Sequence, residues 1–229
     1  MKIGFTGMEL PEGKIKYRDE ILLALEEKDK PKKVAPYFAE FIHNEFVQSD
    51  AIVLPAGSIL DLLILDMEKI ETRINRLTDE GDRVLMEKCL EHLENETPLC
   101  DVEFNEEERS LLREIAPHSF KPVLALKEET DVNTIIDLAL EKANLMFFYT
   151  SGPDESHAWL VNKGSDIVTC AGKIHSDLAR GFIKGDVVSF EDYMKCHNFN
   201  ECKSKGLAKL TDRDYIVQSG EIIEIRFNA

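Results

Sequence analysis

The sequence predicts an α/β region followed by an α+β region of the β-grasp (ubiquitin-like) type. Up to residue 144, short apolar strands alternate with segments of helical periodicity, which is typical of a small parallel α/β core. A polar break at 78–82 separates two apolar helical stripes and predicts a helical hairpin inserted into this core. After residue 145, strand-like runs dominate and one good helix crosses them.

The N-terminal elements follow from apolar spacing and from turn residues. We expect strands at 2–6 and 51–54, and helices at 17–27 and 37–47. The second helix rests on Phe38, Phe41 and Ile42, whose spacing suits one helical face. Pro55 ends the second strand.

The helical hairpin is expected over 58–97. Ser58 with Asp61 three residues later approximates a capping box at its start. An almost wholly apolar stripe follows along the first helix, through Ile59, Leu62, Leu63, Asp66, Ile70, Ile74 and Leu77. A turn at 78–82 leads to a second helix over 83–94. Such a pair packs on itself and its neighbouring domain or, alternatively, offers a surface to a partner.

The remaining elements complete both regions. Asn105 before three glutamates predicts a helix start, because asparagine caps helices and acids favour the first turn. We then expect a buried strand at 122–126 and a helix at 131–143. Further strands are expected at 146–149, 158–161, 182–189, 215–218 and 222–227, with helices at 166–174 and 191–195. Ser219–Gly220 predicts a hairpin between the last two strands.

Composition excludes several classes of protein. Hydrophobic residues make up 43% and charged residues 31% of the chain, which indicates a folded rather than a disordered protein. No apolar run approaches the roughly 20 residues of a membrane helix, and the N-terminus does not resemble a secretory signal. The five cysteines form no CxxC pair, so we expect no metal site. The chain is therefore expected in the cytoplasm, with reduced thiols and no membrane contact.

The net charge of −16 is unevenly spread. Residues 1–145 contain 18 Lys and Arg against 32 Asp and Glu, whereas residues 146–229 contain 10 against 12. The first part should therefore repel polyanions. Any RNA contact is expected in the second part, and DNA is not an expected partner.

A set of motifs in fixed order covers residues 145–229. They are FFYTSGP at 147–153, AW at 158–159, AGKIHSD at 171–177, RGFI at 180–183, YIVQSGEII at 215–223 and RFN at 226–228. In this order they closely resemble the TGS domain of YchF/Obg-like ATPases, a DUF933-like segment. The family usually has Thr where this chain has Ser176 and Phe where it has Leu178, and both changes are mild.

A weaker resemblance to the same family extends upstream. Residues 50–52 resemble a core strand of its nucleotide-binding (G) domain, 60–77 the start of its coiled-coil insertion, and 99–124 the return from that insertion. The resemblance therefore implies three parts. They are a degenerate, reduced P-loop-like G-domain remnant at 1–57 and 98–144, an antiparallel helical hairpin at 58–97, and a TGS-like β-grasp domain at 145–229.

The segment that should hold nucleotide phosphates departs from the P-loop pattern. A P-loop needs a Gly-rich loop of fixed length, a lysine, and a Ser or Thr for magnesium. Gly7, Gly13 and Lys14 occupy the matching places, but five residues separate the glycines and the residue after the lysine is an isoleucine. Glu9 and Glu12 would also repel phosphate oxygens. We interpret the segment as a structural leftover.

Other parts of a catalytic site are missing from the sequence. No DxxG segment lies between Gly13 and Asp50, and the place of the family's base-reading Asn-x-x-Glu holds KEETD at 127–131. Glu128 lacks the amide that reads a base. His175 and its two polar neighbours are adjacent and cannot converge as a triad. We therefore assign no catalytic residue and no cofactor, and ATP or GTP with magnesium is not expected.

These observations favour a non-enzymatic binding protein whose TGS module contacts RNA, the ribosome or a protein partner, as the resemblance implies. The candidate contacts are Lys163, Lys173, His175, Arg180, Lys184, Lys203, Lys205, Lys209 and Arg213. Alternatively, these residues form a solvated face of mixed charge, and His175 hydrogen-bonds within its own domain. A second alternative is a residual ATP- or GTP-binding enzyme with an atypical site at 7–14. A third is a decoy that occupies the binding site of an intact YchF-like ATPase.

Overall fold

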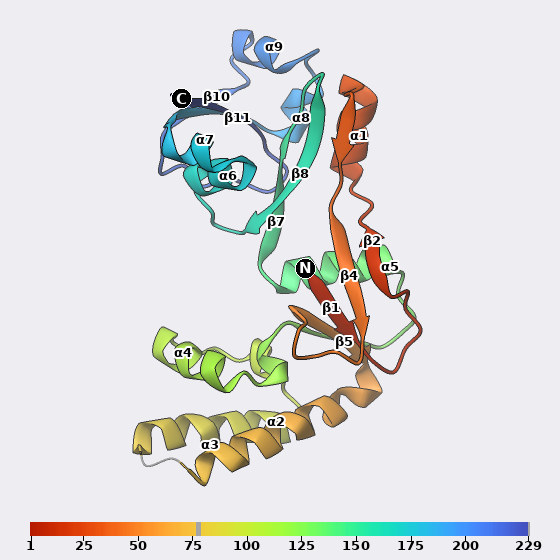
Figure 1. Cartoon of the computed structure of the whole chain (residues 1–229), viewed down its shortest axis with the longest axis vertical. Helices are drawn as coiled ribbons and strands as arrows, with labels where there is room; N and C mark the ends of the chain where they lie inside the picture. Colours follow the sequence, from red (N-terminus) through yellow and green to blue (C-terminus); the bar gives the residue numbers. More distant parts are fainter. Residues whose placement is uncertain (77–78, 229) are drawn as a thin grey trace. The chain divides into compact units, whose positions relative to one another are not determined.

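The computed structural model describes residues 1–76 and 79–228, which divide into two compact units, each built on its own β-sheet (Figure 1). The first unit comprises residues 1–15 and 39–143, and the second comprises 16–38 and 144–229. Segment 16–38 thus belongs to the second unit, whereas the sequence alone suggests the N-terminal remnant. The expected hairpin residues Leu77 and Thr78 lie outside the described residues.

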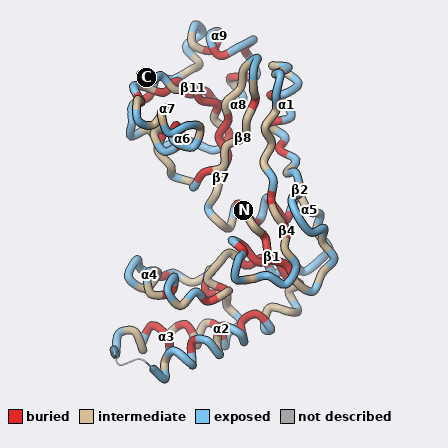
Figure 2. The backbone as a smooth tube through the Cα atoms, in the orientation of Figure 1, coloured by how far each residue is buried: buried red, intermediate tan, exposed pale blue. Residues whose placement is uncertain are grey.

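The sheet of the first unit has five strands in the order β2-β4-β1-β5-β6. At its centre, β1 (Lys2–Phe5) is parallel to both β4 (Phe38–His43) and β5 (Ala51–Pro55). β5 is in turn parallel to β6 (Val123–Leu126), and β2 (Gly13–Lys16) forms the edge beside β4. β1 and β5 are buried over most of their length, as expected of strands covered on both faces (Figure 2).

The helix predicted at 37–47 is wrong, because β4 occupies this segment. Ala39 and Phe41 are buried and their neighbours are more exposed, so burial alternates with the period of a strand. Pairing with β1, from Lys2 opposite Glu40 onward, fixes this register. Pairing with a central strand therefore overrides the helical spacing of the local aromatic residues.

The helices of the first unit match the predicted pattern. They are α2 (Ile59–Ile74), α3 (Glu80–Glu94), α4 (Glu106–Ile115) and α5 (Val132–Lys142), with short 3₁₀ turns η1 (Ala56–Ser58), η2 (Leu99–Asp101) and η3 (His118–Phe120). The apolar stripe of α2 packs against α3 and α4 in one cluster that includes Leu63, Ile70, Met86 and Leu112. At the start of α4, Asn105 forms a complete capping box. In the described residues, no helix is both long and apolar enough to cross a membrane.

Asp66 is the polar member of the α2 stripe and is fully buried. Its carboxylate accepts hydrogen bonds from the backbone N–H groups of His118 and Ser119, both at 2.6 Å. These bonds satisfy the carboxylate and hold η3, the turn that leads into β6, against α2.

The sheet of the second unit has six strands in the order β10-β9-β11-β7-β8-β3. Their bounds are β3 (Lys33–Ala35), β7 (Leu145–Thr150), β8 (Glu155–Asn162), β9 (Phe182–Val188), β10 (Lys209–Thr211) and β11 (Ile222–Phe227). β11 runs parallel to β7 and antiparallel to β9, and β7 forms an antiparallel pair with β8. The helices are α1 (Glu20–Asp29), α6 (Ile167–Ile174), α7 (Ser176–Arg180), α8 (Phe190–Tyr193) and α9 (Phe199–Ser204).

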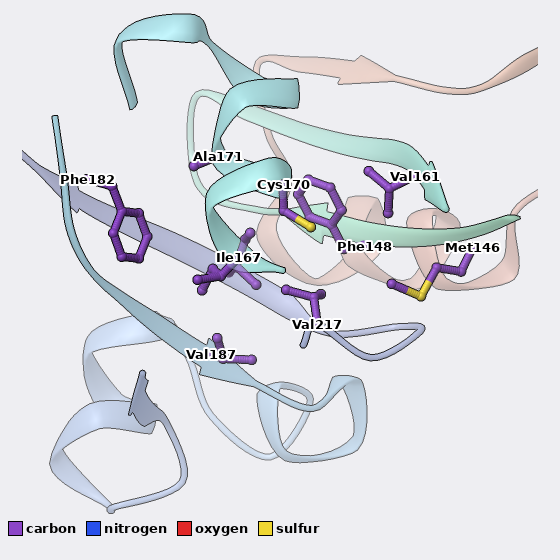
Figure 3. Packing of buried hydrophobic residues seen from close by; sticks show 10 residues of the cluster. Met146, Phe148, Val161, Ile167, Cys170, Ala171, Phe182, Val187 and Val217 are labelled. Carbon is purple, nitrogen blue, oxygen red and sulfur yellow. The ribbon is translucent and has the colours of Figure 1, made fainter. Parts of the chain in front are cut away.

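The core of this sheet lies against α6 (Figure 3). Ile167 and Cys170 of α6 pack on buried residues of the strands, among them Phe148, Phe182 and Val187. Gly185 in β9 permits this close approach, because a Cβ there would lie 2.1 Å from the Ile167 side chain.

The strand and hairpin predicted at 215–220 are wrong. A single bridge joins Asp166 to Ile216, and Gly220, at φ +83°, turns the chain into β11. β10, which no sequence pattern predicts, pairs with β9. The short length of β10 explains the omission, because three residues carry too little periodicity to be recognised.

Buried polar contacts hold segment 16–38 in the second unit. The Tyr149 hydroxyl donates to Asp19 at 2.8 Å, and Asp29 accepts from Tyr193 at 2.7 Å and from Ser151 at 2.6 Å. Burial and the neighbouring carboxylates raise the pKa of both tyrosines, so each remains a donor. β3 also extends the sheet beside β8.

Asp186 in β9 is the buried centre of an ion-pair network. Arg226 binds its carboxylate with two hydrogen bonds of 2.7 and 2.8 Å, and Lys203 lies 3.2 Å away. Lys203 also pairs with Glu224 at 2.7 Å. Burial disfavours the charged form of Asp186, but the bonds from Arg226 and Lys203 outweigh burial and hold its pKa below the usual range.

Replacing Asp66 by alanine should destabilise the first unit by about 3 kcal/mol, because two buried N–H groups lose their acceptor. Hydrogen exchange of peptides from the first unit would measure this loss. The control is Glu68→Ala, an exposed change in the same helix that should cost less than about 0.5 kcal/mol. Equal effects of the two variants would contradict the role of Asp66.

The second unit should lose stability in acid through Asp186. Its native pKa is lowered, so its contribution is complete above the ordinary value of 3.8 and is lost as pH falls through the native pKa. Asp186→Asn should therefore reduce stability at pH 7 and flatten its decline below about pH 4. Fluorescence of Trp159, the single tryptophan and part of this unit, reports the unfolding. The exposed Asp212→Asn is the control; an unchanged pH profile for Asp186→Asn would refute the assignment.

Candidate functional site

A cavity of about 650 Å³ opens in the first unit where β1, β5 and β6 end. These strands are parallel, so the loops that follow them meet at one edge of the sheet. Ligands of open parallel sheets bind at this carboxyl edge. The volume is also that of an ordinary small-molecule site.

The walls of the cavity are apolar and its rim is acidic. The apolar residues are Met8, Leu10, Pro55, Leu126, Val132 and Ile135. The polar residues are Glu9, Lys127, Glu128, Glu129, Thr130 and Asp131. The polar part of the lining therefore contains four carboxylates and one ammonium group.

The predicted phosphate-binding residues are only partly at the cavity. Gly7 has φ +67° and lies against Pro55, where an added Cβ would come within 3.1 Å of the proline ring. Residues 8–10 then line the cavity. Gly13 and Lys14, however, lie in β2 and are not among its lining residues.

The chain after β1 also lacks the local geometry of a phosphate cradle. A P-loop joins a strand to a helix, and the first N–H groups of that helix hold the phosphates. Here β1 is followed by β2, and the next helix, α1, begins at Glu20 in the second unit. In the first 19 described residues no helix offers its N-terminus to a ligand.

The helix that begins at the cavity, α5, is capped by its own side chain. Asp131 accepts hydrogen bonds from the backbone of Asn133 at 3.0 Å and Thr134 at 3.1 Å, and from the Thr134 hydroxyl at 2.5 Å. The hydroxyl bond is the main cause that lowers the pKa of Asp131. An anion at this helix end would therefore have to displace a carboxylate.

The remaining carboxylates of the rim have no counter-charge of their own. Glu9, Glu128 and Glu129 are exposed, and in the described part of the chain none forms an ion pair within 4.0 Å. The whole first unit holds 12 basic and 27 acidic residues. Its field opposes a polyphosphate. Within residues 1–76 and 79–228, no group of three His, Cys, Asp or Glu is arranged to hold a metal ion.

The candidate contacts of the second unit lie on several elements and mostly have partners within the unit. Lys184 pairs with Asp212, and Lys205 pairs with Glu201 at 2.6 Å. Lys203 belongs to the Asp186 network. Carboxylates of the same unit therefore neutralise these lysines.

The other candidates are also held by local contacts. Arg180 pairs with Asp177 at 2.5 Å, and the His175 Nδ1 accepts from the Asp177 backbone N–H at 3.2 Å, so His175 caps α7. Lys209 lies 4.7 Å from the Tyr215 ring, and Arg213 donates to the Phe182 carbonyl at 3.2 Å. Lys163 has a contact as well, and Lys173 is exposed on α6. Most of these candidates are therefore engaged by groups of their own unit.

The sequence singles out 127–131 only as the place of the family's base-reading motif, and it predicts neither the cavity nor its apolar walls. A usable signal was present, because Met8 and Leu10 are apolar residues in a loop directly after a buried strand. Val132 and Ile135 carried a second signal, at the start of the helix that follows β6.

Part of the chain matches a known protein family, and the whole fold is similar to a solved structure. Residues 145–228 match the family model YchF-GTPase_C, described as a protein of unknown function (DUF933). Ribosome-binding ATPase YchF of Bacillus subtilis (strain 168) is 25% identical over 236 residues, which cover 74% of this chain and 64% of that protein. Human Obg-like ATPase 1 is 39% identical over 94 residues, 41% of this chain and 24% of that protein.

A second bacterial relative shows the same partial coverage. Ribosome-binding ATPase YchF of Mycoplasma genitalium is 36% identical over 109 residues, 48% of this chain and 30% of that protein. The chain thus spans less than two thirds of the length of these relatives. The solved structure of the Schizosaccharomyces pombe YchF GTPase shares the fold, with a TM-score of 0.81, 17% identity, and coverage of 99% of this chain and 97% of that one. Residues 145–228 therefore match the YchF-GTPase_C family, and the chain is similar to YchF and Obg-like ATPases over part of their length.

Proposed function

We propose that this chain is a non-enzymatic binding protein of the YchF family, with a disabled P-loop and an intact TGS module that contacts a protein partner of the translation machinery. One observation supports the proposal that the P-loop is disabled. β1 continues into the edge strand β2, so Lys14 lies in a strand instead of opening a helix toward a phosphate. The acidic rim of the cavity supports the same conclusion.

The topology of the second unit supports a TGS-type β-grasp module. The β7–β8 hairpin precedes the crossing helix α6, and β11 returns parallel to β7 at the middle of the sheet. This arrangement is the one expected of a β-grasp fold. The module is complete in its core, from Met146 to Ile223. In the proposed organisation, the first unit is a reduced G domain with the hairpin at 58–97 as its insertion.

The charges of the second unit favour a protein surface over an RNA backbone. Its lysines and arginines are largely paired with carboxylates of the same unit, and the unit as a whole holds 16 basic and 17 acidic residues. RNA binding through phosphates needs free basic groups. The relatives named ribosome-binding ATPase YchF point to a partner on or near the ribosome.

The competing hypothesis is a residual nucleotide-binding enzyme with an atypical site at 7–14. The cavity at the carboxyl edge favours it, because this is where nucleotides bind to such sheets. Four rim carboxylates and the capped end of α5 oppose it. Nucleotide titration separates the two functions.

Neither ATP nor GTP should bind with a Kd below about 1 mM, with or without magnesium, and neither should be hydrolysed. The reasons are the acidic rim and the absence of a helix N-terminus after β1. Calorimetry and a phosphate-release assay on the full chain would measure binding and turnover. An intact YchF relative is the positive control.

The triple variant Glu9→Gln, Glu128→Gln, Glu129→Gln serves as a second control for the nucleotide titration. Weak ATP binding by this variant alone would identify charge repulsion as the cause. Submillimolar binding or turnover by the unchanged chain would reject the non-enzymatic function.

Association with ribosomes should weaken only slightly as salt rises. If the module contacts protein and at most two phosphates, the affinity should fall by about tenfold or less between 50 and 200 mM salt. Co-sedimentation of the full chain with ribosomes at several salt concentrations would measure this dependence. Lys173→Glu, which reverses the exposed charge of α6, should change the affinity by less than about threefold. A loss of a thousandfold or more over the same range would instead indicate binding to RNA phosphates.

A further inference from the structure

We propose that the cavity at the carboxyl edge of the first sheet binds an organic cation with an apolar body, an ammonium or guanidinium group joined to an aliphatic or aromatic portion. The inference rests on the proposed function, because it assigns a new class of ligand to a site that has lost its nucleotide.

The walls can bury the apolar part of such a ligand. Met8 and Leu10 of the loop after β1, Leu126 at the end of β6, and Val132 and Ile135 at the start of α5 line one space of about 650 Å³. This volume holds a ligand the size of a typical small molecule. Burial of its apolar surface supplies the affinity, since exposed charges alone contribute little.

The rim selects the charge of the ligand. Glu9, Glu128 and Glu129 accept hydrogen bonds only, and none is paired with a cation in the described residues. They belong to the loops after β1 and β6, so an occupant of the cavity would meet carboxylates from two segments. An ammonium or guanidinium group supplies the missing donors and counter-charge.

The same features disfavour other small ligands. A carboxylate or phosphate ligand would meet four acids and a single lysine, Lys127. A bare metal ion would require converging ligands, and the described residues contain no group of three that could hold one. A polyamine without an apolar portion would leave the walls unfilled.

A matched pair of probes tests the proposal on the full chain. 4-Phenylbutylamine carries an aromatic body and an ammonium group, and 4-phenylbutanoate carries the same body with the opposite charge. By calorimetry, the amine should bind with a submillimolar Kd and the carboxylate at least tenfold more weakly. Equal affinity for both probes, or no binding of the amine, would overturn the proposal.

The triple variant Glu9→Gln, Glu128→Gln, Glu129→Gln should weaken the amine by about tenfold, because each exposed ion pair contributes a factor of roughly 1.5 to 5. Glu107→Gln, an exposed change on α4 outside the cavity, should leave the affinity unchanged. If both variants bind the amine as the unchanged chain does, the amine occupies another place and the proposal fails.

A peptide competition identifies the source of the cation, and an ATP titration separates failure of the cation site from failure of the proposed function. A capped leucine–lysine–leucine peptide that competes with the amine and binds more tightly would indicate a partner's side chain, whereas tighter binding of the amine would indicate a small molecule. Both results support the cation site. If neither the amine nor the peptide binds and ATP does not bind either, the cation site is wrong and the proposed function stands. Submillimolar ATP binding would overturn the proposed function as well.

Discussion

Parallel pairing of β1 with both β4 and β5 is the constraint on which the first unit depends. It buries β1 at the centre of the sheet and directs the loops after β1, β5 and β6 to one edge. A cavity at that edge is a consequence of this topology and does not require a nucleotide. The ligand class is set afterwards by the side chains of the loops, and in this chain those are apolar residues surrounded by carboxylates.

Carboxylates of the chain itself accept hydrogen bonds from several donors in both units. Asp131 caps α5 through three hydrogen bonds, so the positive end of that helix is already neutralised. In the second unit, Asp186 accepts both Arg226 and Lys203, and Glu201 pairs with Lys205. In both units, internal acids therefore satisfy donors that a phosphate would need, which supports the proposal that neither unit binds a polyanion.

Local sequence signals predicted the elements that local physics determines. The cap of Asn105, the apolar stripe of α2 and the buried strand β6 rest on short-range rules, and the structure confirms them. One local prediction is wrong, because Ser58 precedes α2 without a capping hydrogen bond from its side chain. The other errors fall where distant pairing decides the outcome. β4 is a strand because β1 lies beside it, and residues 215–218 lack a strand partner beyond one bridge. The segment KEETD at 127–131 stands out in the sequence only as the place of the family's base-reading motif, and the cavity is not predicted. Its apolar walls come from the loop after β1, the end of β6 and the start of α5, and no periodicity connects these segments.

The position of α1 connects two features of the proposed function, the loss of the phosphate site and the intact carboxy-terminal unit. In a P-loop protein the helix after the first strand completes the phosphate site. Here that helix belongs to the second unit, where Asp19 and Asp29 accept hydrogen bonds from Tyr149 and Tyr193. Withdrawing α1 and Asp19 from these contacts would leave the buried hydroxyls of Tyr149 and Tyr193 without their acceptors, at a cost of several kcal/mol. If the proposed function is correct, restoring glycines, lysine and serine to the loop at 7–14 would therefore not be enough to form a nucleotide site. The proposed loss of the phosphate site and the packing of the second unit would then depend on the same helix.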